Sequence, residues 1–191
     1  MGYVVTGIAA SGEKAIRKAG LEKPALVLMD IMLRGEMNGI EAAKQIHSQF
    51  NIPVVFLTAY ADPRIIEQAK EAEPFGYLIK SYEDRQLKAT IEIALDKFQA
   101  QEEIRRLALH DSLTDLPNRK LFYDRLTHAR SRAYRYQQIV ALLYIDLDEF
   151  GVVNKMFDQE AGDIILKKVA SRLKQSVRKT DTVARMGGDE F

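Results

Sequence analysis

The sequence has no cysteine, almost no net charge and no long hydrophobic run. Without cysteine, a disulfide scaffold, a thiolate metal site and a cysteine nucleophile are all excluded. The formal net charge of +1 gives neither the basic field typical of nucleic-acid binding nor an acidic disordered tail. No apolar run approaches the length of a membrane span, and no signal peptide is recognisable. We therefore expect a cytoplasmic protein with no nucleic-acid partner and no membrane association.

The composition that remains, with 47% hydrophobic and 29% charged residues, is that of an ordinary globular protein, and 191 residues fit one or two domains. In the first half, short apolar runs alternate with amphipathic stretches, one of which Ser11 can cap. Continuous apolar strands separated by helices indicate a parallel sheet covered on both faces. The predicted strands are Tyr3–Ala9, Ala25–Met29, Pro53–Leu57 and Gly76–Ile79.

Three of these strands are followed by a polar residue: Asp30, Thr58 or Lys80. In open α/β sheets, the site lies at the carboxyl ends of the strands. A carboxylate at such a place can attack a phosphoryl group and form an acyl phosphate, with an ammonium and a hydroxyl binding the phosphate oxygens. The alternative is a structural Asp–Lys ion pair, and spacing alone does not decide between the two.

The stretch from Glu83 to Leu109 contains neither proline nor glycine and is predicted to form one long helix that serves as a linker. Its heptad pattern lapses at Gln101 and Arg105, which leaves a coiled coil possible but weakly supported. The apolar residues at helical spacing are Leu87, Ile91, Ala94 and Phe98.

The second half is predicted to contain two helices and two strands. Asn118 can cap the first helix, and Ile165, Val169 and Leu173 mark the second. The predicted strands are Ile139–Ile145 and Thr182–Met186, and Gly187-Gly188 is a turn signal.

Carboxylates gather after both of these strands, at Asp146-Leu147-Asp148-Glu149 and at Asp189-Glu190. Hard divalent cations prefer oxygen ligands, and nucleotide phosphates can complete their coordination. Two such metals can stabilise the attacking and leaving oxygens of a phosphoryl displacement. The alternative is a Gly-Gly hairpin with solvated acids.

The segments Leu26-Val27-Leu28-Met29-Asp30, Leu57-Thr58-Ala59 and Gly76-Tyr77-Leu78-Ile79-Lys80 resemble those of response-regulator receiver domains, from about Gly2 to Ile93. The resemblance implies that Asp30 is the phosphoacceptor in a phosphorelay fed by a cognate histidine kinase. It also implies that Thr58, Tyr77 and Lys80 are the switch residues.

Two departures from the receiver pattern stand out. The family's first strand and helix, with the acidic pair that binds Mg²⁺, are missing, so we expect the chain to be a fragment of a longer protein. The family usually has proline after the lysine, where this chain has Ser81. A cis bond before serine costs about 2.5–4 kcal/mol, so we expect a trans bond.

The second half is similar to GGDEF, or diguanylate cyclase, domains from about Leu109 to Phe191. The resemblance implies that two GTP molecules, one on each protomer of a homodimer, condense to cyclic di-GMP. The matching segments are Asp111-x-Leu113-Thr114-x-Leu116-Pro117-Asn118-Arg119, Asp146-Leu147-Asp148-x-Phe150, Asn154, Gly162-Asp163 and Ala184-Arg185-x-Gly187–Phe191.

The same resemblance implies, position by position, which residues bind metal, nucleotide and product. The resemblance implies that the Mg²⁺ (or Mn²⁺) ligands are Asp146, Leu147 through its carbonyl, Asp189 and Glu190. It also implies that Asp189 and Glu190 are the catalytic pair, with Glu190 as ligand or base. Substrate binding is implied for Glu149 and Phe150, which hold phosphate, and for Asn154 and Asp163, which read guanine.

Arg178-Lys179-Thr180-Asp181 matches the family's RxxD inhibitory site for cyclic di-GMP. Arginine suits such a site because it can clamp phosphate or stack on a base. Taken alone, Arg178 and Asp181 are more typical of a routine ion pair at a helix end.

Four residues depart from the GGDEF pattern: Gly151, Lys155, Asp158 and Gln159. Losing the family's lysine at Gly151 would weaken contact with the triphosphate. The leading hypothesis is a response regulator with diguanylate cyclase output, of which this chain is an inactive fragment. The alternative is a degenerate GGDEF domain that binds GTP or cyclic di-GMP without turnover.

The two resemblances together imply an α/β protein in three parts. Residues 1–93 form an incomplete doubly wound (flavodoxin-like) receiver domain that lacks its first strand and helix. Residues 94–109 form the helical linker. Residues 110–191 form the first part of a GGDEF domain with a nucleotidyl-cyclase-like, ferredoxin-like α+β fold.

Overall fold

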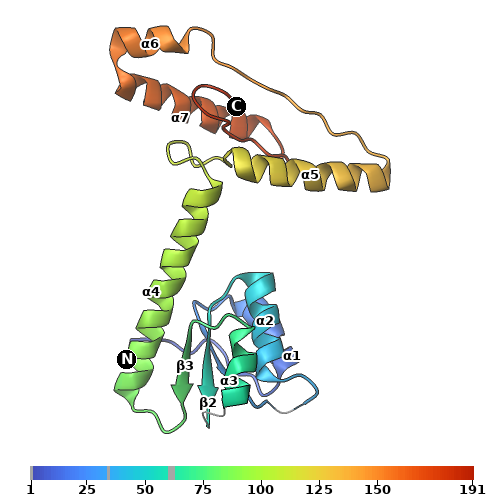
Figure 1. Cartoon of the computed structure of the whole chain (residues 1–191), viewed down its shortest axis with the longest axis vertical. Coiled ribbons are helices and arrows are strands. Elements are labelled where there is room, and N and C mark those ends of the chain that lie inside the picture. Colours follow the sequence, from blue (N-terminus) through green and yellow to red (C-terminus); the bar gives the residue numbers. More distant parts are fainter. Residues whose placement is uncertain (1, 34, 60–62) are drawn as a thin grey trace. The chain divides into compact units, whose positions relative to one another are not determined.

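The structure is a computed structural model that describes residues 2–33, 35–59 and 63–191, without the side chains of residues 63–66. Met1, the first residue of the predicted receiver range, lies outside the described residues. The chain divides into two compact units, unit 1 at Met1–Glu102 and unit 2 at Glu103–Phe191 (Figure 1). The predicted domain boundaries stay a prediction.

Unit 1 alternates strands and helices around a parallel sheet, as the sequence predicts. The sheet has the order β1-β2-β3 and both pairings are parallel, so β2 is the central strand. The elements are α1 (Gly12–Glu22), β1 (Val27–Asp30), α2 (Gly39–Phe50), β2 (Val54–Thr58), α3 (Pro63–Lys70), β3 (Gly76–Ile79) and the first part of α4 (Asp84–Leu109).

The side chains of β2 alternate between two apolar layers, because successive residues of a strand face opposite sides. Val54 and Phe56 join the larger cluster with buried residues of α1, α2 and α3. Val55 joins a smaller cluster with Phe75 and with Ala94 of α4. Helices α1, α2 and α3 therefore cover one face of the sheet and α4 covers the other (Figure 1).

Helix α2 is fixed at its start by a reciprocal pair of hydrogen bonds. The side chain of Asn38 accepts from the amide of Glu41, and the side chain of Glu41 accepts from the amide of Asn38. This capping box satisfies two amides that a helix leaves unpaired. Ser11 also stands at the cap position of α1, as predicted, but its side chain makes no capping hydrogen bond.

The predicted strand at Tyr3–Ala9 is wrong. The segment has no regular secondary structure, and Val4 and Ile8 are 86% and 81% exposed. A strand needs the amides and carbonyls of a neighbouring strand, and β1 is paired only with β2 among the described residues. An apolar run without such a neighbour stays extended and exposed.

Unit 2 is helical. Helix α4 continues from unit 1 to Leu109, which agrees with the predicted linker helix, and three further helices follow. A small apolar cluster around Leu116, Leu166, Ala170 and Phe191 forms its core. The further helices are α5 (Arg119–Tyr136), α6 (Phe150–Phe157) and α7 (Gln159–Ser176), and α6 packs on α7.

The predicted strands at Ile139–Ile145 and Thr182–Met186 are also wrong. Neither segment forms a strand, and Ile139 is 96% exposed. Isolated pairing nevertheless begins at two points. Ile145 exchanges two backbone hydrogen bonds with Phe191, of 2.8 and 2.7 Å, and Gly187 bridges to Glu190. Single bridges of this kind do not supply the continuous ladder that a strand requires.

None of the helices within the described residues is long and apolar enough to cross a lipid bilayer.

Candidate functional site

The first candidate site lies where β1 and β2 end. The Nζ atom of Lys80 lies 2.5 Å from Oδ2 of Asp30, while the amide of Met32 donates to Oδ1 at 3.0 Å. The side chains of Asp30 and Lys80 are 30% and 43% exposed, so solvent reaches both. The carboxylate is thus held by one cation and one amide at an accessible edge of the sheet.

Thr58 ends β2 and is buried, and its carbonyl accepts a hydrogen bond of 2.7 Å from the amide of Lys80. The parallel register places Asp30 beside Leu57 and Thr58 beside Ile79. The three predicted polar residues therefore gather at one edge of the sheet, as their positions after consecutive strands suggested.

Tyr77, the fourth predicted receiver residue, lies on β3 with its ring 6.0 Å from that of Phe56. Burial raises the pKa of its hydroxyl, an effect that the charge of Lys70 partly opposes. Its oxygen is buried and has no hydrogen-bond partner within the described part of the chain. A buried hydroxyl without a partner is costly, so this side chain gains from any rearrangement that gives it one.

Gly39 fixes the backbone next to Asp30. A Cβ atom at this first residue of α2 would lie 1.9 Å from the carbonyl oxygen of Asp30. The amide of Gly39 also donates to the carbonyl of Ile31 at 2.9 Å. Only glycine lets the helix start this close to the end of β1.

The peptide bonds of the described residues are all trans, which agrees with the expectation for Ser81. Ser81 has φ 81°, a left-handed conformation that is unusual for serine. Lys80 nevertheless reaches Asp30.

The second candidate site is a tight hairpin turn in unit 2. The amide of Glu190 donates to the carbonyl of Gly187 at 2.9 Å, and the amide of Met186 donates to the carbonyl of Glu190 at 2.9 Å. Gly187 and Gly188 have φ of 144° and 53°, which an L side chain rarely adopts. The two glycines thus shape the turn that presents Asp189 and Glu190.

Asp146 lies close to these acids. Its pKa is raised, first by burial and then by the negative charges of Asp189, Glu190 and Asp148. The pKa of the neighbouring Tyr144 is raised as well, chiefly because its hydroxyl is hydrogen-bonded to Glu190. The sequence-predicted acids are therefore close enough to repel one another, which is the electrostatic condition that a cation relieves.

The described residues contain no group of three histidine or acidic side chains already arranged around a metal position. The donors nevertheless have the chemistry that Mg²⁺ or Mn²⁺ requires, because carboxylate oxygens suit hard cations. Magnesium is usually bound by one or two carboxylates together with nucleotide phosphates. The acids at this turn fit that pattern of shared coordination.

The predicted substrate residues lie on α6 and α7. Asn154 of α6 has a buried Oδ1 with no partner among the described residues, and a Cβ added at Gly162 of α7 would lie 2.0 Å from it. Asp163 follows Gly162 on α7, and Glu149 and Phe150 stand where α6 begins. The structure therefore places Asn154 at the α6–α7 contact, next to the turn of helix that carries Asp163.

Asp158 and Gln159, which depart from the GGDEF pattern, form the junction of α6 and α7. The side chain of Asp158 accepts from the amide of Ala161 at 2.9 Å and so caps α7. This gives Asp158 a structural role. Gly151 of α6 has open space where a side chain would point.

Arg178 and Asp181 close a turn after α7. The carboxylate of Asp181 accepts from the amide of Arg178 at 3.0 Å, and the amide of Asp181 donates to the carbonyl of Arg178 at 3.0 Å. The two residues are thus brought together through the backbone of Arg178.

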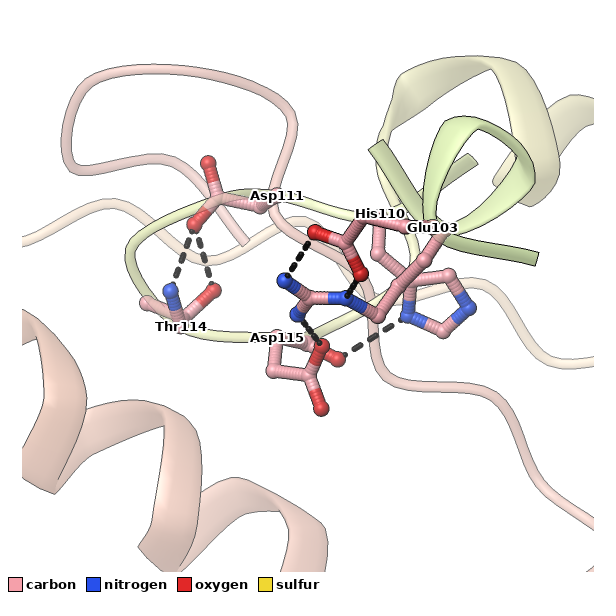
Figure 2. A network of polar contacts seen from close by, with 6 residues as sticks. Glu103, His110, Asp111, Thr114 and Asp115 are labelled. Carbon is pink, nitrogen blue, oxygen red and sulfur yellow. Dashed lines mark hydrogen bonds and ion pairs between the residues drawn. The ribbon is translucent and has the colours of Figure 1, made fainter. Parts of the chain in front are cut away.

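Sequence reasoning gave no role to Asp111 and Arg185, which form the best-buried ion pair of unit 2. The Nη1 atom of Arg185 lies 2.9 Å from Oδ1 of Asp111, and the side chains are 11% and 22% exposed. The same carboxylate accepts from the amide and hydroxyl of Thr114, at 2.9 and 2.6 Å (Figure 2). Both residues occur in the quoted motifs, but no local spacing indicates that they meet.

Burial by itself would raise the pKa of Asp111. Hydrogen bonds from Thr114 and Arg185 outweigh that effect and hold the pKa below its ordinary value. Arg185 also donates from Nε and Nη2 to the carbonyl of Gly188, at 2.9 and 2.6 Å. The pair therefore reaches the hairpin turn that carries the acids.

Comparison with known proteins agrees with the division of the chain into two units. Residues 1–92 match the response regulator receiver domain, and residues 108–191 match the diguanylate cyclase, GGDEF domain. A receiver domain of a modulated diguanylate cyclase from Desulfovibrio desulfuricans G20 is 37% identical, covering 52% of this chain and 79% of that one, with a TM-score of 0.50.

Two further relatives carry diguanylate cyclase or GGDEF in their names. The bifunctional diguanylate cyclase/cyclic di-GMP phosphodiesterase MucR of Pseudomonas aeruginosa is 46% identical over 115 residues, which are 60% of this chain and 17% of MucR. The coiled coil and GGDEF domain of DgcB from Caulobacter crescentus, solved with c-di-GMP, is 31% identical, covering 56% of this chain and 55% of that one, with a TM-score of 0.50. The chain spans 27% of the length of the diguanylate cyclase TpbB, another curated relative.

The chain thus combines a unit that has an aspartate and a lysine at the edge of a parallel sheet with a unit that has an acid-bearing Gly-Gly turn. The chain belongs to the response regulator receiver family in its first half and to the GGDEF diguanylate cyclase family in its second.

Proposed function

We propose that the protein to which this chain belongs is a response regulator whose GGDEF unit condenses two GTP molecules to cyclic di-GMP. The observation that carries the proposal is the Gly187–Gly188 turn that presents Asp189 and Glu190, whose negative charges help to raise the pKa of Asp146, in a chain of this family. In the reaction, each 3′-hydroxyl attacks the α-phosphate of the other GTP. Two phosphodiester bonds form, two pyrophosphates leave, and the hydroxyl protons pass to a base.

The acids have two tasks in this proposal. Asp146 and Asp189, helped by the Leu147 carbonyl, hold Mg²⁺ or Mn²⁺ together with the triphosphate. Such a cation neutralises charge on the phosphate oxygens. Glu190 is a further ligand or takes the proton of the attacking hydroxyl. The raised pKa of Asp146 supports this assignment, since the repulsion among the acids is largest when no cation is bound.

Guanine recognition is assigned to Asn154 and Asp163, and phosphate binding to the backbone at Glu149 and Phe150. A carboxylate can accept from N1–H and the exocyclic amine of guanine together, a pair that adenine does not offer. The buried Oδ1 of Asn154 supports the assignment, because a buried acceptor is stabilised by a donor.

In unit 1, we assign Asp30 as the acceptor of a phosphoryl group from a histidine kinase. An Asp30 oxygen would attack phosphorus, the bond to the donor would break, and an acyl phosphate would result. Lys80, already 2.5 Å from the carboxylate, would then face the phosphate oxygens. Thr58 and Tyr77 would rearrange, with the buried Tyr77 hydroxyl gaining a partner.

The remaining assignments rest on the resemblance. Two copies must meet for two GTP molecules to react, so the active form is a homodimer. We assign this homodimer to the cytoplasm. Arg178 and Asp181 bind cyclic di-GMP as feedback inhibitor. The domain limits proposed are 1–93 for the receiver, 94–109 for the linker and 110–191 for the GGDEF part.

The test of this proposal is nucleotide binding by the purified chain with Mg²⁺, measured by calorimetry. Asp163→Ala is expected to weaken GTP binding by about 100-fold or more while changing ATP binding little, because unpaired polar groups discriminate strongly. Glu160→Ala, an exposed acid on the same helix, is the matched control. Equal losses for GTP and ATP would refute Asp163 as the guanine reader.

A second function is favoured by the departures at Gly151, Lys155 and Asp158. The GGDEF unit would then bind GTP or cyclic di-GMP without turnover. An assay of labelled GTP with the full-length protein separates the two, because a binding module retains nucleotide and forms no cyclic di-GMP. The open space beside Gly151 allows Gly151→Lys, which is expected to tighten GTP binding in either case.

A further inference from the structure

A chain of polar contacts starts in the last turns of α4. Arg106 donates from Nε and Nη2 to the two carboxylate oxygens of Glu103, each at 2.9 Å, and from Nη1 to Oδ1 of Asp115 at 3.0 Å. Nδ1 of His110 lies 3.0 Å from the carbonyl oxygen of Asp115. Figure 2 shows the carboxylates of Glu103 and Asp115 near one another, with the His110 ring beside them. The turn that follows α4 is therefore tied to the helix by side chains.

Asp115 occupies a demanding position in this turn. Its φ is 57°, in the left-handed region that glycine tolerates best and aspartate tolerates with some cost. Its amide donates to the carbonyl of Asp111 at 2.9 Å, which closes the turn from Asp111 to Asp115. A residue that keeps an unfavourable conformation is fixed by its surroundings, here Arg106 and His110.

The contacts continue to the hairpin turn at Gly187 and Gly188. Asp111, at the start of the closed turn, pairs with Arg185, and Arg185 donates twice to the carbonyl of Gly188. The amide of Arg185 also donates to the carbonyl of Pro117 at 3.0 Å. Gly188 directly precedes Asp189, so the guanidinium fixes the backbone from which the acids project.

We propose that Arg185 is a positioning residue for Asp189 and Glu190, and that the Arg106–Asp115 pair couples its placement to the end of α4. The catalytic role of Asp189 and Glu190 rests on the proposed function, but the coupling between α4 and the hairpin turn does not. A change in the last turns of α4 would move the turn at Asp111–Asp115, and through Asp111 and Arg185 it would move the carbonyl of Gly188.

Arginine is required at position 185 by geometry. Its planar group donates to a carboxylate from one nitrogen and to one carbonyl from two others. A lysine carries the same charge on a single nitrogen and lacks this fixed fork. Arg185→Lys therefore removes the geometry and keeps the charge.

The coupling is tested in the whole chain by ¹H–¹⁵N NMR of the amides of Gly187 and Gly188. Asp115→Gly keeps a residue suited to the left-handed conformation and removes only the carboxylate that Arg106 contacts. We expect it to shift both glycine signals, and Arg185→Lys to shift them further. Arg132→Gln, an exposed arginine of α5, is the control and should leave them unchanged.

Unchanged glycine signals in Asp115→Gly would overturn the coupling to α4, and unchanged signals in Arg185→Lys would overturn the positioning role. Circular dichroism verifies that each variant is folded. If Arg185→Lys does not fold, Asp115→Gly still decides the coupling, and Asp111→Asn, which removes the charge that Arg185 pairs with, decides the positioning role by the same two signals.

A second readout connects the coupling to the metal site. We expect Arg185→Lys to weaken Mn²⁺ binding, measured by calorimetry, by about tenfold or more, as loss of an outer positioning group does. Asp115→Gly should weaken it less, and the double variant should show less than the sum of the two effects. Additive effects would overturn the coupling. A wild-type chain that binds no Mn²⁺ would count against the proposed function, while the glycine signals would still decide the coupling.

Discussion

Strand β2 in unit 1 and the segment 139–145 in unit 2 are both continuous apolar runs, yet only one of them is a strand. Val54–Thr58 has a parallel neighbour on each side and is buried at four of its five positions. The segment 139–145 has no strand beside it among the described residues, and Leu143 is 72% exposed. Apolar side chains alone do not make a strand, because the backbone must also find partners for its amides and carbonyls.

The two units also differ in what holds them together. Unit 1 has apolar clusters on both faces of its sheet, with Phe56 and Ile46 fully buried. Unit 2 has a smaller apolar cluster and a largely buried ion pair between Asp111 and Arg185. Unit 1 should therefore respond most to changes in packing, and unit 2 to changes in charge.

The largest effect is expected from Phe56→Ala in the core of unit 1. Removing a fully buried aromatic ring costs about 3–5 kcal/mol of unfolding free energy. Phe157→Ala on α6, where the ring is 66% exposed, is the control and should cost well under half as much. Urea unfolding with hydrogen exchange resolved by segment measures both. Equal losses of protection in both units after Phe56→Ala would contradict the separation drawn above.

Gly39→Ala is the next largest. The added methyl group would overlap the carbonyl of Asp30, so either α2 or the end of β1 must move. Overpacking of this kind costs about 1–3 kcal/mol. Gly151→Ala on α6 is the matched control. With open space around its Cβ position, it should stabilise the chain by about 0.5–1 kcal/mol. Thermal unfolding distinguishes the two, and a neutral Gly39→Ala would show that the helix start is not tightly fixed.

The charge dependence of unit 2 is tested at Asp111. Its pKa is lowered from the ordinary value of 3.8 in the folded chain, so its contribution to stability is complete above that value and is lost as the pH falls through the lower, folded pKa. Asp111→Asn should cost about 1–3 kcal/mol at neutral pH and remove that acid dependence. The measurement is the urea midpoint of wild type and of Asp111→Asn across this pH range. Asp124→Asn, on the exposed face of α5, is the control. A wild-type acid response that persists in Asp111→Asn would assign the effect to another group.

The smallest effect compares two helix caps in unit 1. Asn38→Ala removes a capping box and should cost about 1 kcal/mol. Ser11→Ala removes a side chain that makes no capping bond and should stay within about 0.5 kcal/mol. Both values come from urea unfolding. Similar losses at the two positions would mean that cap position matters more than the bond itself.

Helices α5 and α7 could be predicted from sequence, because their hydrogen bonds join residues that are close in the chain, whereas α6 was not predicted. The helix marked by Ile165, Val169 and Leu173 and the cap at Asn118 are read from local spacing and are found in the structure. Parallel strands were predicted where neighbours exist. Those at Tyr3–Ala9 and Ile139–Ile145 were not found, since pairing depends on segments that a local pattern does not reveal.

The candidate sites follow the same rule. Asp30 and Lys80 follow predicted strands, so their meeting could be anticipated from the sheet. Asp111 and Arg185 are 74 residues apart and meet through the fold of unit 2, with no periodicity to indicate it. Sequence reasoning therefore anticipated the meeting of Asp30 and Lys80 but not the contact between Asp111 and Arg185.

The aromatic contacts of Phe75, the residue just before β3, have an optical consequence. The Phe75 ring packs edge-on against Phe98 of α4 at 5.4 Å and against His47 of α2 at 5.8 Å. The chain contains no tryptophan. Phe98→Trp would thus place a single indole fluorophore where α4 meets the sheet. Its emission would report the docking of α4 in real time, free of any other indole signal.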